Sequence, residues 1–224
     1  MGSGSMKNSR WTHRPFEIQG QRFCHEPTCQ ITVSIHELAE SLGRAIDLKD
    51  RYTQNHSADV AVTAYLIATA LSLDSNTRDI IHIAGHLHDI GKIGVSDQTL
   101  KNEGRLSDDQ WLEMRNHPMF GYEILKEVKG LGHDGGIADM VLYHHERCDG
   151  SGYPEGLTKE EIPLGAKILA VADSFSAMID DRRYRKGRPR KEAAAEIARG
   201  SGTLYDPRVV TAFLSIETEA GEKQ

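Results

Sequence analysis

The chain has 224 residues, of which 38% are hydrophobic and 27% are charged, and its formal net charge is −6. This length suits one domain with a sizeable core, and the composition excludes a disordered chain. The acidic balance argues against binding to a nucleic acid polymer, which needs a basic surface. The apolar runs fall far short of the ~20 residues of a transmembrane helix, so we expect no membrane span.

The first 33 residues show no sustained periodicity, and we expect an N-terminal extension over residues 1–33. The opening Met-Gly-Ser-Gly-Ser resembles a cloning remnant, and no signal peptide is visible. The three cysteines, Cys24, Cys29 and Cys148, are too few for a disulfide framework and fit a reducing compartment. We therefore predict a cytoplasmic protein.

From Ser34 onward the sequence has helical character. Ser34 and Glu37 have the spacing of a capping box, and apolar residues follow at helical intervals. A second helix is predicted from His56 to Leu71, where a sequence that is apolar on all sides indicates burial. A third helix is predicted from Thr77 to Asp89, with Gly91 as its C-terminal stop.

The second half of the chain continues the helical pattern. Residues 91–105 are expected to form a loop, after which Ser107 caps a helix and Pro118 starts another. Further helices are predicted over residues 137–145, 164–178, 191–199 and 207–215. Because no strand alternation or internal repeat is evident, the predicted class is all-α, with one domain over residues 34–216 and a tail at 217–224.

A His-Asp pair at the end of the third helix suggests a metal site. His88 and Asp89 offer a nitrogen and an oxygen donor, and the two oxygens of Asp89 could bridge two metal ions. Asp173 lies inside an apolar helix, where a buried carboxylate requires a cation. Further histidines lie at predicted helix ends or in turns. The candidate ligands are His56, His88, Asp89, His117, His144, His145 and Asp173.

This set of ligands points to hydrolysis of phosphate esters. Imidazole nitrogens suit iron, zinc, manganese, nickel and copper. Two such ions about 3.5–4 Å apart would activate a shared water and neutralise an attacked phosphodiester. Lys92 and the basic segment 182–191, which holds seven Lys or Arg residues among ten, would contact phosphate. The alternative for that segment is a solvated, basic start of a helix.

Five motifs in order, HDIGKIG, NHP, HHERCDGSGYP, ADSF and RRYRK, resemble the HD-GYP family of bacterial phosphodiesterases over residues 34–216. The resemblance implies an HD-domain bundle of about seven helices around a metal centre. It also implies hydrolysis of cyclic di-GMP to linear pGpG and, in some members, on to GMP. The GYP loop of the family, here Gly152, Tyr153 and Pro154, is implicated in contacts with GGDEF-domain partners.

Carried over residue by residue, the resemblance distributes the ligands over two divalent ions, with Asp89 shared by both. One ion would take His56, His88, Asp89 and Asp173, and the other would take Asp89, His117, His144 and His145. Asp89 and Lys92 would be the catalytic residues, and Lys92, Arg182 and Arg185 would hold the phosphates of the substrate. Iron is the expected metal, with manganese or another transition metal as the alternative. No third ion is expected, because Tyr52 stands where three-metal members carry Glu.

Several positions depart from the family pattern. Cys148 stands where an aromatic residue is usual, and Ser176 replaces a frequent Asp that we do not expect to touch a metal. The additional histidines His82, His86 and His133 are interpreted as structural.

Three other functions remain open. The chain could bind a cyclic dinucleotide with slow turnover and signal through the GYP loop, because loop closure can limit a site with intact ligands. It could prefer 3′,3′-cyclic GMP-AMP, since the choice between guanine and adenine rests on a few polar contacts. It could also act on another phosphate ester. The oligomeric state does not follow from the sequence.

Overall fold

The computed structural model describes residues 16–18, 21–22, 31–50, 55–181 and 186–222. The chain divides into two compact units, residues 1–38 and residues 39–224. The first unit contains three short strands: β1 (Phe16–Ile18), β2 (Gln21–Arg22) and β3 (Ile31–Thr32). β1 is the central strand, antiparallel to β2 and parallel to β3. No signal in the sequence predicted these strands, because strands of two or three residues are too short to show alternation.

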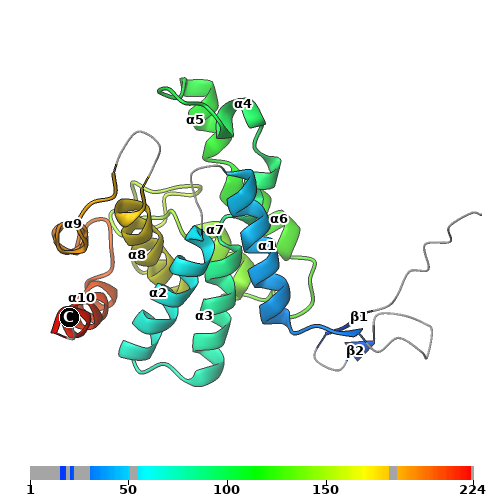
Figure 1. Cartoon of the computed structure of the whole chain (residues 1–224), viewed down its shortest axis with the longest axis horizontal. Helices are drawn as coiled ribbons and strands as arrows, with labels where there is room; N and C mark the ends of the chain where they lie inside the picture. The colour runs from blue at the N-terminus through cyan, green and yellow to red at the C-terminus, as the bar shows by residue number, and fades with distance from the viewer. Residues whose placement is uncertain (1–15, 19–20, 23–30, 51–54, 182–185, 223–224) are drawn as a thin grey trace, which may run out of the picture. The chain divides into compact units, whose positions relative to one another are not determined.

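The described chain from Ser34 onward is built from helices, which confirms the all-α prediction for this part (Figure 1). The elements are α1 (Ile35–Lys49), α2 (His56–Ala70), α3 (Ser75–Leu87), the 3₁₀ helix η1 (Ile90–Gly94), α4 (Asp97–Leu100), α5 (Asp108–Met114), α6 (His117–Leu125), α7 (Ile137–Tyr143), α8 (Leu164–Ile179), α9 (Arg190–Arg199) and α10 (Pro207–Glu222).

Side-chain caps fix where several helices begin. The amide of Glu37 donates to Ser34 Oγ at 3.1 Å, and the amide of Ser34 donates to Glu37 Oε2 at 2.9 Å, so the predicted capping box is present. Ser107 caps α5 in the same way. Asp74 accepts a hydrogen bond from the amide of Thr77, and α3 therefore begins two residues earlier than predicted.

Helices α2, α3, α7 and α8 form the centre of the second unit. α2 packs against α3, α8 and α10, and α7 packs against α3, α6 and α8. Figure 1 shows α2 (cyan) beside α8 (yellow). Both helices are largely apolar, so burial among several neighbours stabilises them. Phe175 on α8 meets Phe213 on α10 with 4.7 Å between ring centroids, and both side chains are fully buried.

The turn after α3 differs from the prediction. α3 ends two residues before Asp89, and Gly91 lies inside η1 without a positive φ, so it is not a helix stop. A Cβ atom at Gly91 would overlap the carbonyl oxygen of His117 and the backbone nitrogen of Gly121. Glycine is required because η1 and α6 meet backbone to backbone, which brings Asp89 next to His117. The predicted loop over 91–105 also contains α4.

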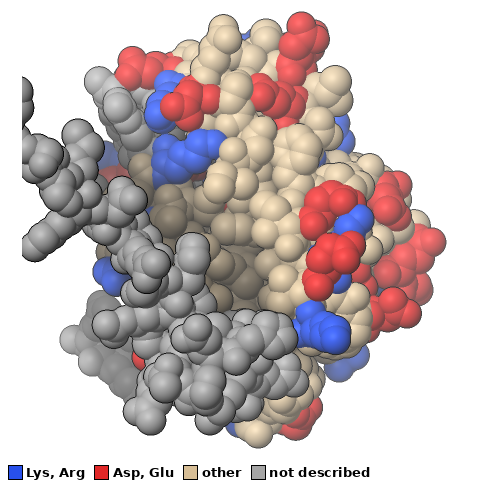
Figure 2. All heavy atoms as spheres, turned by 90° about the vertical axis from the view of Figure 1, so that its right-hand side faces the viewer, with Lys and Arg blue, Asp and Glu red and all other residues tan. Residues whose placement is uncertain are grey.

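Charge is unevenly distributed over the surface. On the face in Figure 2, acidic side chains gather along the right-hand edge, whereas the middle of this face carries few charges. This face therefore offers no broad basic surface for a nucleic acid polymer, in keeping with the net charge of −6. In the part of the chain that the structure describes, no helix has the length and apolar character needed to span a membrane.

Candidate metal centre

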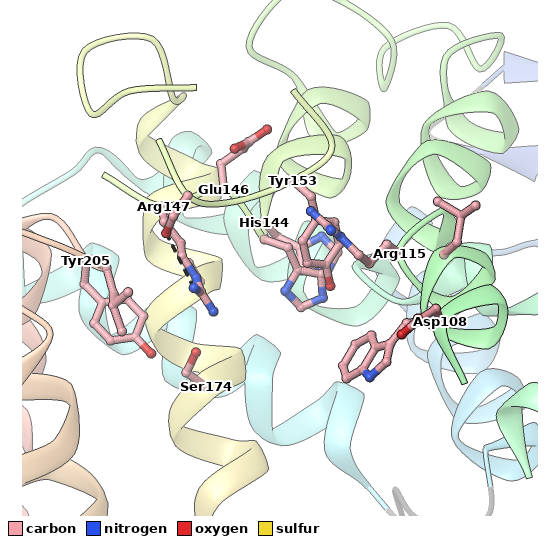
Figure 3. A pocket seen from close by; sticks show the side chains of 14 residues that line it. Asp108, Arg115, His144, Glu146, Arg147, Tyr153, Ser174 and Tyr205 are labelled. Atoms are coloured by element: carbon pink, nitrogen blue, oxygen red, sulfur yellow. Dashed lines mark hydrogen bonds between the residues drawn. The ribbon is translucent and has the colours of Figure 1, made fainter. Parts of the chain in front are cut away.

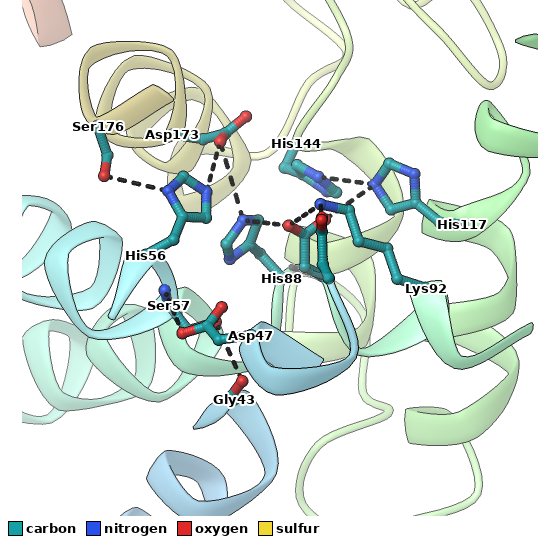
Figure 4. A network of polar contacts seen from close by, with 12 residues as sticks. Gly43, Asp47, His56, Ser57, His88, Lys92, His117, His144, Asp173 and Ser176 are labelled. Carbon is teal, nitrogen blue, oxygen red and sulfur yellow. Dashed lines mark hydrogen bonds and ion pairs between the residues drawn. The ribbon is translucent and has the colours of Figure 1, made fainter. Parts of the chain in front are cut away.

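The fold brings the seven candidate ligands together, and Figure 4 shows His56, His88, His117, His144 and Asp173 among them. They come from the start of α2, the turn after α3, the start of α6, the end of α7 and the middle of α8. Among these seven residues, two groups have ligand atoms within 4.8 Å of one another: His56, His88 and Asp173, and His117, His144 and His145.

Asp89 lies between these two groups. Its Oδ2 atom is 3.3 Å from His88 Nε2, and its Oδ1 atom is 3.3 Å from His117 Nε2. Burial alone would raise the pKa of the Asp89 carboxyl, but Lys92 and His88 hold it well below its usual value. Asp89 is therefore an ionised carboxylate with one oxygen facing each group, as a bridging ligand requires.

Three of the histidines are oriented by the backbone of the preceding helical turn. In each, Nδ1 donates to the backbone carbonyl three residues earlier, at 2.6–2.8 Å. Because a carbonyl oxygen can only accept, Nδ1 carries a proton, which leaves Nε2 as the ring atom that can bind a metal ion in the centre. The pairs are His88 with Gly85, His117 with Met114, and His144 with Val141.

The Nε2 atoms of these rings fit a cation. Nε2 of His117 and Nε2 of His144 face each other at 3.4 Å, an unfavourable approach for two neutral imidazoles. Burial lowers the pKa of both rings, that of His117 to about 3, so a shared proton does not relieve the contact at neutral pH. His88 Nε2 is buried and faces Asp89 Oδ2 at 3.3 Å without a well-formed hydrogen bond. A metal ion would satisfy all three atoms.

His56 is held differently, because it opens α2 and follows a turn. Its Nε2 lies 3.1 Å from Asp173 Oδ1, and its Nδ1 lies 3.1 Å from Ser176 Oγ and 3.2 Å from Asp180 Oδ2. Burial opposes a charge on His56, but Asp173 and Asp180 raise its pKa to about 10. A proton therefore joins His56 to Asp173, at the place where a metal would join them. Sequence analysis missed Asp180.

Lys92, predicted to contact a phosphate, makes two buried ion pairs. Its Nζ atom lies 2.8 Å from Asp50 Oδ2 and 2.8 Å from Asp89 Oδ2. Burial alone would lower the pKa of Lys92, but the two carboxylates raise it above its usual value. Lys49 holds the same turn, because its Nζ donates to three backbone carbonyls at 2.9–3.0 Å, those of Lys92, Ile93 and Val95. Sequence analysis missed both Asp50 and Lys49.

The GYP loop packs against the metal centre. The ring of Tyr153 lies 4.8 Å from that of His145 with 31° between the planes, and the guanidinium of Arg115 lies 4.7 Å from the centroid of the Tyr153 ring. The amide of Tyr153 also donates to the carbonyl of His145 at 3.2 Å. Tyr153 therefore helps to fix the position of a candidate ligand.

Glu146, only 3% exposed, holds the other end of this loop. Its carboxylate accepts three backbone hydrogen bonds at 2.7–3.0 Å, from Glu155, Gly156 and Leu157. Gly152 is required at its position, because a Cβ atom there would overlap the backbone of Arg147 and Glu146. The loop is therefore tied to the end of α7, which carries His144.

A pocket of about 730 Å³ opens beside the centre (Figure 3). His144 and His145 are part of its wall, so the second ligand group faces it directly. Figure 3 shows Tyr205 at one end and Asp108 at the other, with His144 between them. Further wall residues are Trp111, Arg115, Arg147, Tyr153 and Ser174.

Some predicted residues cannot be compared with the structure. Arg182, Arg185 and Tyr52 lie outside the described residues. Of the other positions singled out in the sequence, Cys148 is half-buried with a free thiol, and burial raises the pKa of that thiol. His82 Nδ1 lies 3.0 Å from the carbonyl oxygen of Ala61.

Comparison with known sequences identifies similar proteins. A family model described as HD domain matches residues 34–209. A cyclic di-GMP phosphodiesterase of Thermotoga maritima is 40% identical over 189 residues, which cover 83% of this chain and 50% of the relative. A 3′3′-cGAMP-specific phosphodiesterase of Vibrio cholerae is 33% identical over 198 residues, which cover 86% of this chain and 42% of the relative. The chain thus spans about half the length of the curated relatives it matches.

A comparison with solved structures finds a similar fold. A protein of Bdellovibrio bacteriovorus described as HDG"Y"P has a TM-score of 0.61 and 16% sequence identity. The match covers 82% of this chain and 63% of that chain. At this identity the likeness concerns the arrangement of helices alone.

Proposed function

The chain belongs to the HD domain family, and we propose that it is a metal-dependent phosphodiesterase that hydrolyses cyclic di-GMP to linear pGpG, with GMP as a further product. The observation that carries this proposal is the pair of ligand groups on either side of Asp89. The name of the relative from Thermotoga maritima supports the choice of substrate.

Two divalent ions per chain are proposed. A donor set dominated by imidazole favours iron, with manganese or another transition metal as the alternative, over magnesium or calcium. Bound there, the ions would lower the pKa of a water and offset the charge that develops on an attacked phosphodiester. One ion would be held by His56, His88, Asp89 and Asp173, and the other by Asp89, His117, His144 and His145.

The substrate is proposed to occupy the pocket beside His144 and His145. Its volume of about 730 Å³ lies in the range of small-molecule sites. Arg115 and Arg147 bring guanidinium groups to its wall, which suit phosphate oxygens and the acceptor edge of guanine. Tyr153 adds an aromatic face next to the ligands.

For Lys92, the ion pairs with Asp50 and Asp89 support a role in holding the bridging carboxylate. A phosphate would have to share the ammonium of Lys92 with these two groups. Arg182 and Arg185 are kept as proposed phosphate ligands on the basis of the family resemblance.

A GGDEF-domain partner is proposed to bind the GYP loop, again from the resemblance. Because the Tyr153 ring packs on His145, its aromatic face is directed to the metal centre and not to a partner. The exposed residues that flank the GYP loop are polar, and a partner would meet these first: Asp149, Ser151 and Glu155.

A second substrate, 3′,3′-cyclic GMP-AMP, is favoured by the name of the relative from Vibrio cholerae. The test is to prepare the protein without oxygen, measure its metal content by mass spectrometry, and follow cleavage of both cyclic dinucleotides in the same sample. We expect about two ions per chain and faster cleavage of cyclic di-GMP. Faster cleavage of 3′,3′-cyclic GMP-AMP would change the substrate assignment. Two ions without any cleavage would favour a binding module.

The variant Asp89→Ala tests the bridge, because it removes an oxygen donor from both groups. It should lose both ions and all cleavage. The matched control is Asp97→Ala, which removes an acidic residue that pairs with Lys101 at 2.6 Å near the surface. The control should keep both ions, and full metal content in Asp89→Ala would contradict the two-ion centre.

A further inference from the structure

His56 depends on a different helix for its orientation. In His88, His117 and His144, the Nδ1–H group donates to the backbone carbonyl three residues earlier. His56 is the first residue of α2, and its Nδ1 instead faces the end of α8. The nearest atoms there are Ser176 Oγ at 3.1 Å and Asp180 Oδ2 at 3.2 Å.

One face of α8 carries the residues that meet His56. Asp173 and Ser176 lie in α8, and Asp180 is its C-cap residue; at a spacing of i, i+3 and i+7, all three meet His56 from the same side of a helix that is otherwise mostly apolar. Asp173 contacts Nε2 of the imidazole, and Asp180 contacts Nδ1. The ring of His56 therefore lies between two carboxylates of one element, and Figure 4 shows it between Asp173 and Ser176.

Burial makes the contact with Asp180 effective. The side chain of His56 is 4% exposed and that of Asp180 is 21% exposed, so water screens the pair only in part. Ser176 Oγ donates to Asp180 Oδ2 at 3.4 Å and helps to hold the carboxylate in place. A carboxylate that accepts the Nδ1 proton fixes the tautomer of an imidazole and makes its Nε2 a stronger donor to a metal.

We propose that Asp180 is a positioning residue that orients His56 and strengthens its Nε2 as a donor to one of the two metal ions. The inference rests on the proposed metal centre. It assigns to Asp180 an effect on the ion of His56, His88 and Asp173 and no effect on the ion of the other group. Asp180 touches no substrate and acts through His56 alone.

The test is titration of the metal-free protein with cobalt(II), whose visible absorption reports the donors around the ion. The wild type should bind about two ions. Asp180→Asn, which keeps the shape and removes the charge, should bind one ion as the wild type does and the other about 10–100-fold more weakly, with altered absorption. The matched control is Asp181→Asn, because Asp181 is exposed and, among the residues that the structure describes, accepts only the amide of Gly187. This control should match the wild type.

A coupling measurement separates orientation of His56 from a general structural effect. In the His56→Ala background, adding Asp180→Asn should cause no further loss of cobalt affinity, because Asp180 acts only through the imidazole. A further loss there, or equal weakening of both ions in the single variant, would overturn the inference. Thermal unfolding verifies that each variant folds, and Asp180→Ser replaces Asp180→Asn if the latter does not fold.

The outcome also separates this inference from the proposed function. If the wild type binds two ions and Asp180→Asn binds both equally well, the role of Asp180 is wrong while the metal centre stands. If the wild type binds no cobalt, the metal centre fails and the role of Asp180 fails with it.

Discussion

At the scale of single residues, buried charges in this protein offset one another. Lys92 lies between Asp50 and Asp89, at 2.8 Å from each, and its side chain is 14% exposed. Each carboxylate would be costly to bury alone, and together they hold the ammonium in one position. Lys92, which was predicted to contact the phosphate of the substrate, therefore also stabilises the turn that carries Asp89, the proposed bridging ligand.

Removal of this ammonium should destabilise the metal-free protein. Lys92→Met removes the cation that lies between two buried carboxylates, and we expect a loss of about 3–5 kcal/mol in the free energy of unfolding. The loss should shrink when metal is bound, since a bound cation also offsets the charge of Asp89. Urea unfolding with chelator and with added metal measures both values.

The matched control for this charge removal is Lys101→Met, which breaks a surface pair with Asp97. Exposed pairs of this kind contribute about 0–1 kcal/mol, so its effect on urea unfolding should be small. An equal loss in both variants would contradict the role assigned to Lys92.

At the scale of elements, the contact between η1 and α6 sets the distance from Asp89 to His117. Gly91→Ala would force these two backbones apart, because the added Cβ overlaps the His117 carbonyl. We expect weaker metal binding by the group that contains His117 and lower stability to urea. Metal stoichiometry and unfolding measure the two effects.

Gly94→Ala is the comparison variant for this contact. Its Cβ would meet the ring of Phe120 at 2.7 Å, and a side chain can move where a backbone cannot. Its effect on metal binding should be smaller than that of Gly91→Ala. If the two alanine variants bind metal equally well, backbone contact between η1 and α6 does not position the ligands.

The GYP loop is a second element whose order depends on one side chain. Glu146→Gln removes a charged acceptor from three backbone amides, at a cost of about 1–3 kcal/mol. Amide hydrogen exchange over residues 155–157 should then be about tenfold faster or more, since 1.4 kcal/mol corresponds to a factor of ten. The control Glu161→Gln alters an exposed acceptor of Thr158 and should leave exchange at 155–157 unchanged. Unchanged exchange in both variants would exclude this role of Glu146.

At the scale of the whole molecule, the candidate ligands join α2, the turn after α3, α6, α7 and α8. A metal bound to all of them stabilises the folded state only, because the unfolded chain does not assemble the site. The melting temperature should therefore rise with metal concentration, with a gain of about 2.7 kcal/mol at a concentration of 100 Kd. Calorimetry over a series of metal concentrations, with a chelated sample as reference, measures this. A melting temperature that does not depend on metal would contradict a centre built across these helices.

Most of the helical pattern could be predicted, because it depends on residues close together in the chain. The capping boxes at Ser34 and Ser107 and the apolar run of α8 are signals of this kind, and the HD domain family was identified from motifs of the same local nature. The short strands β1, β2 and β3 were not predicted, and the role of Gly91 was predicted wrongly. The strands lack a periodic signal, and the need for Gly91 comes from α6, which follows it by many residues.

By itself, the sequence determined the all-α fold class and the approximate bounds of the helices. It also determined that histidines and aspartates lie at helix ends. Only the tertiary structure decided that the two oxygens of Asp89 face different ligand groups, that Lys92 pairs with Asp50, and that Asp180 faces His56. The stripe of Asp173, Ser176 and Asp180 on α8 was a signal in the sequence, but its partner was not. The physical reason is that periodicity specifies which side chains share a face, whereas helix packing decides what that face meets.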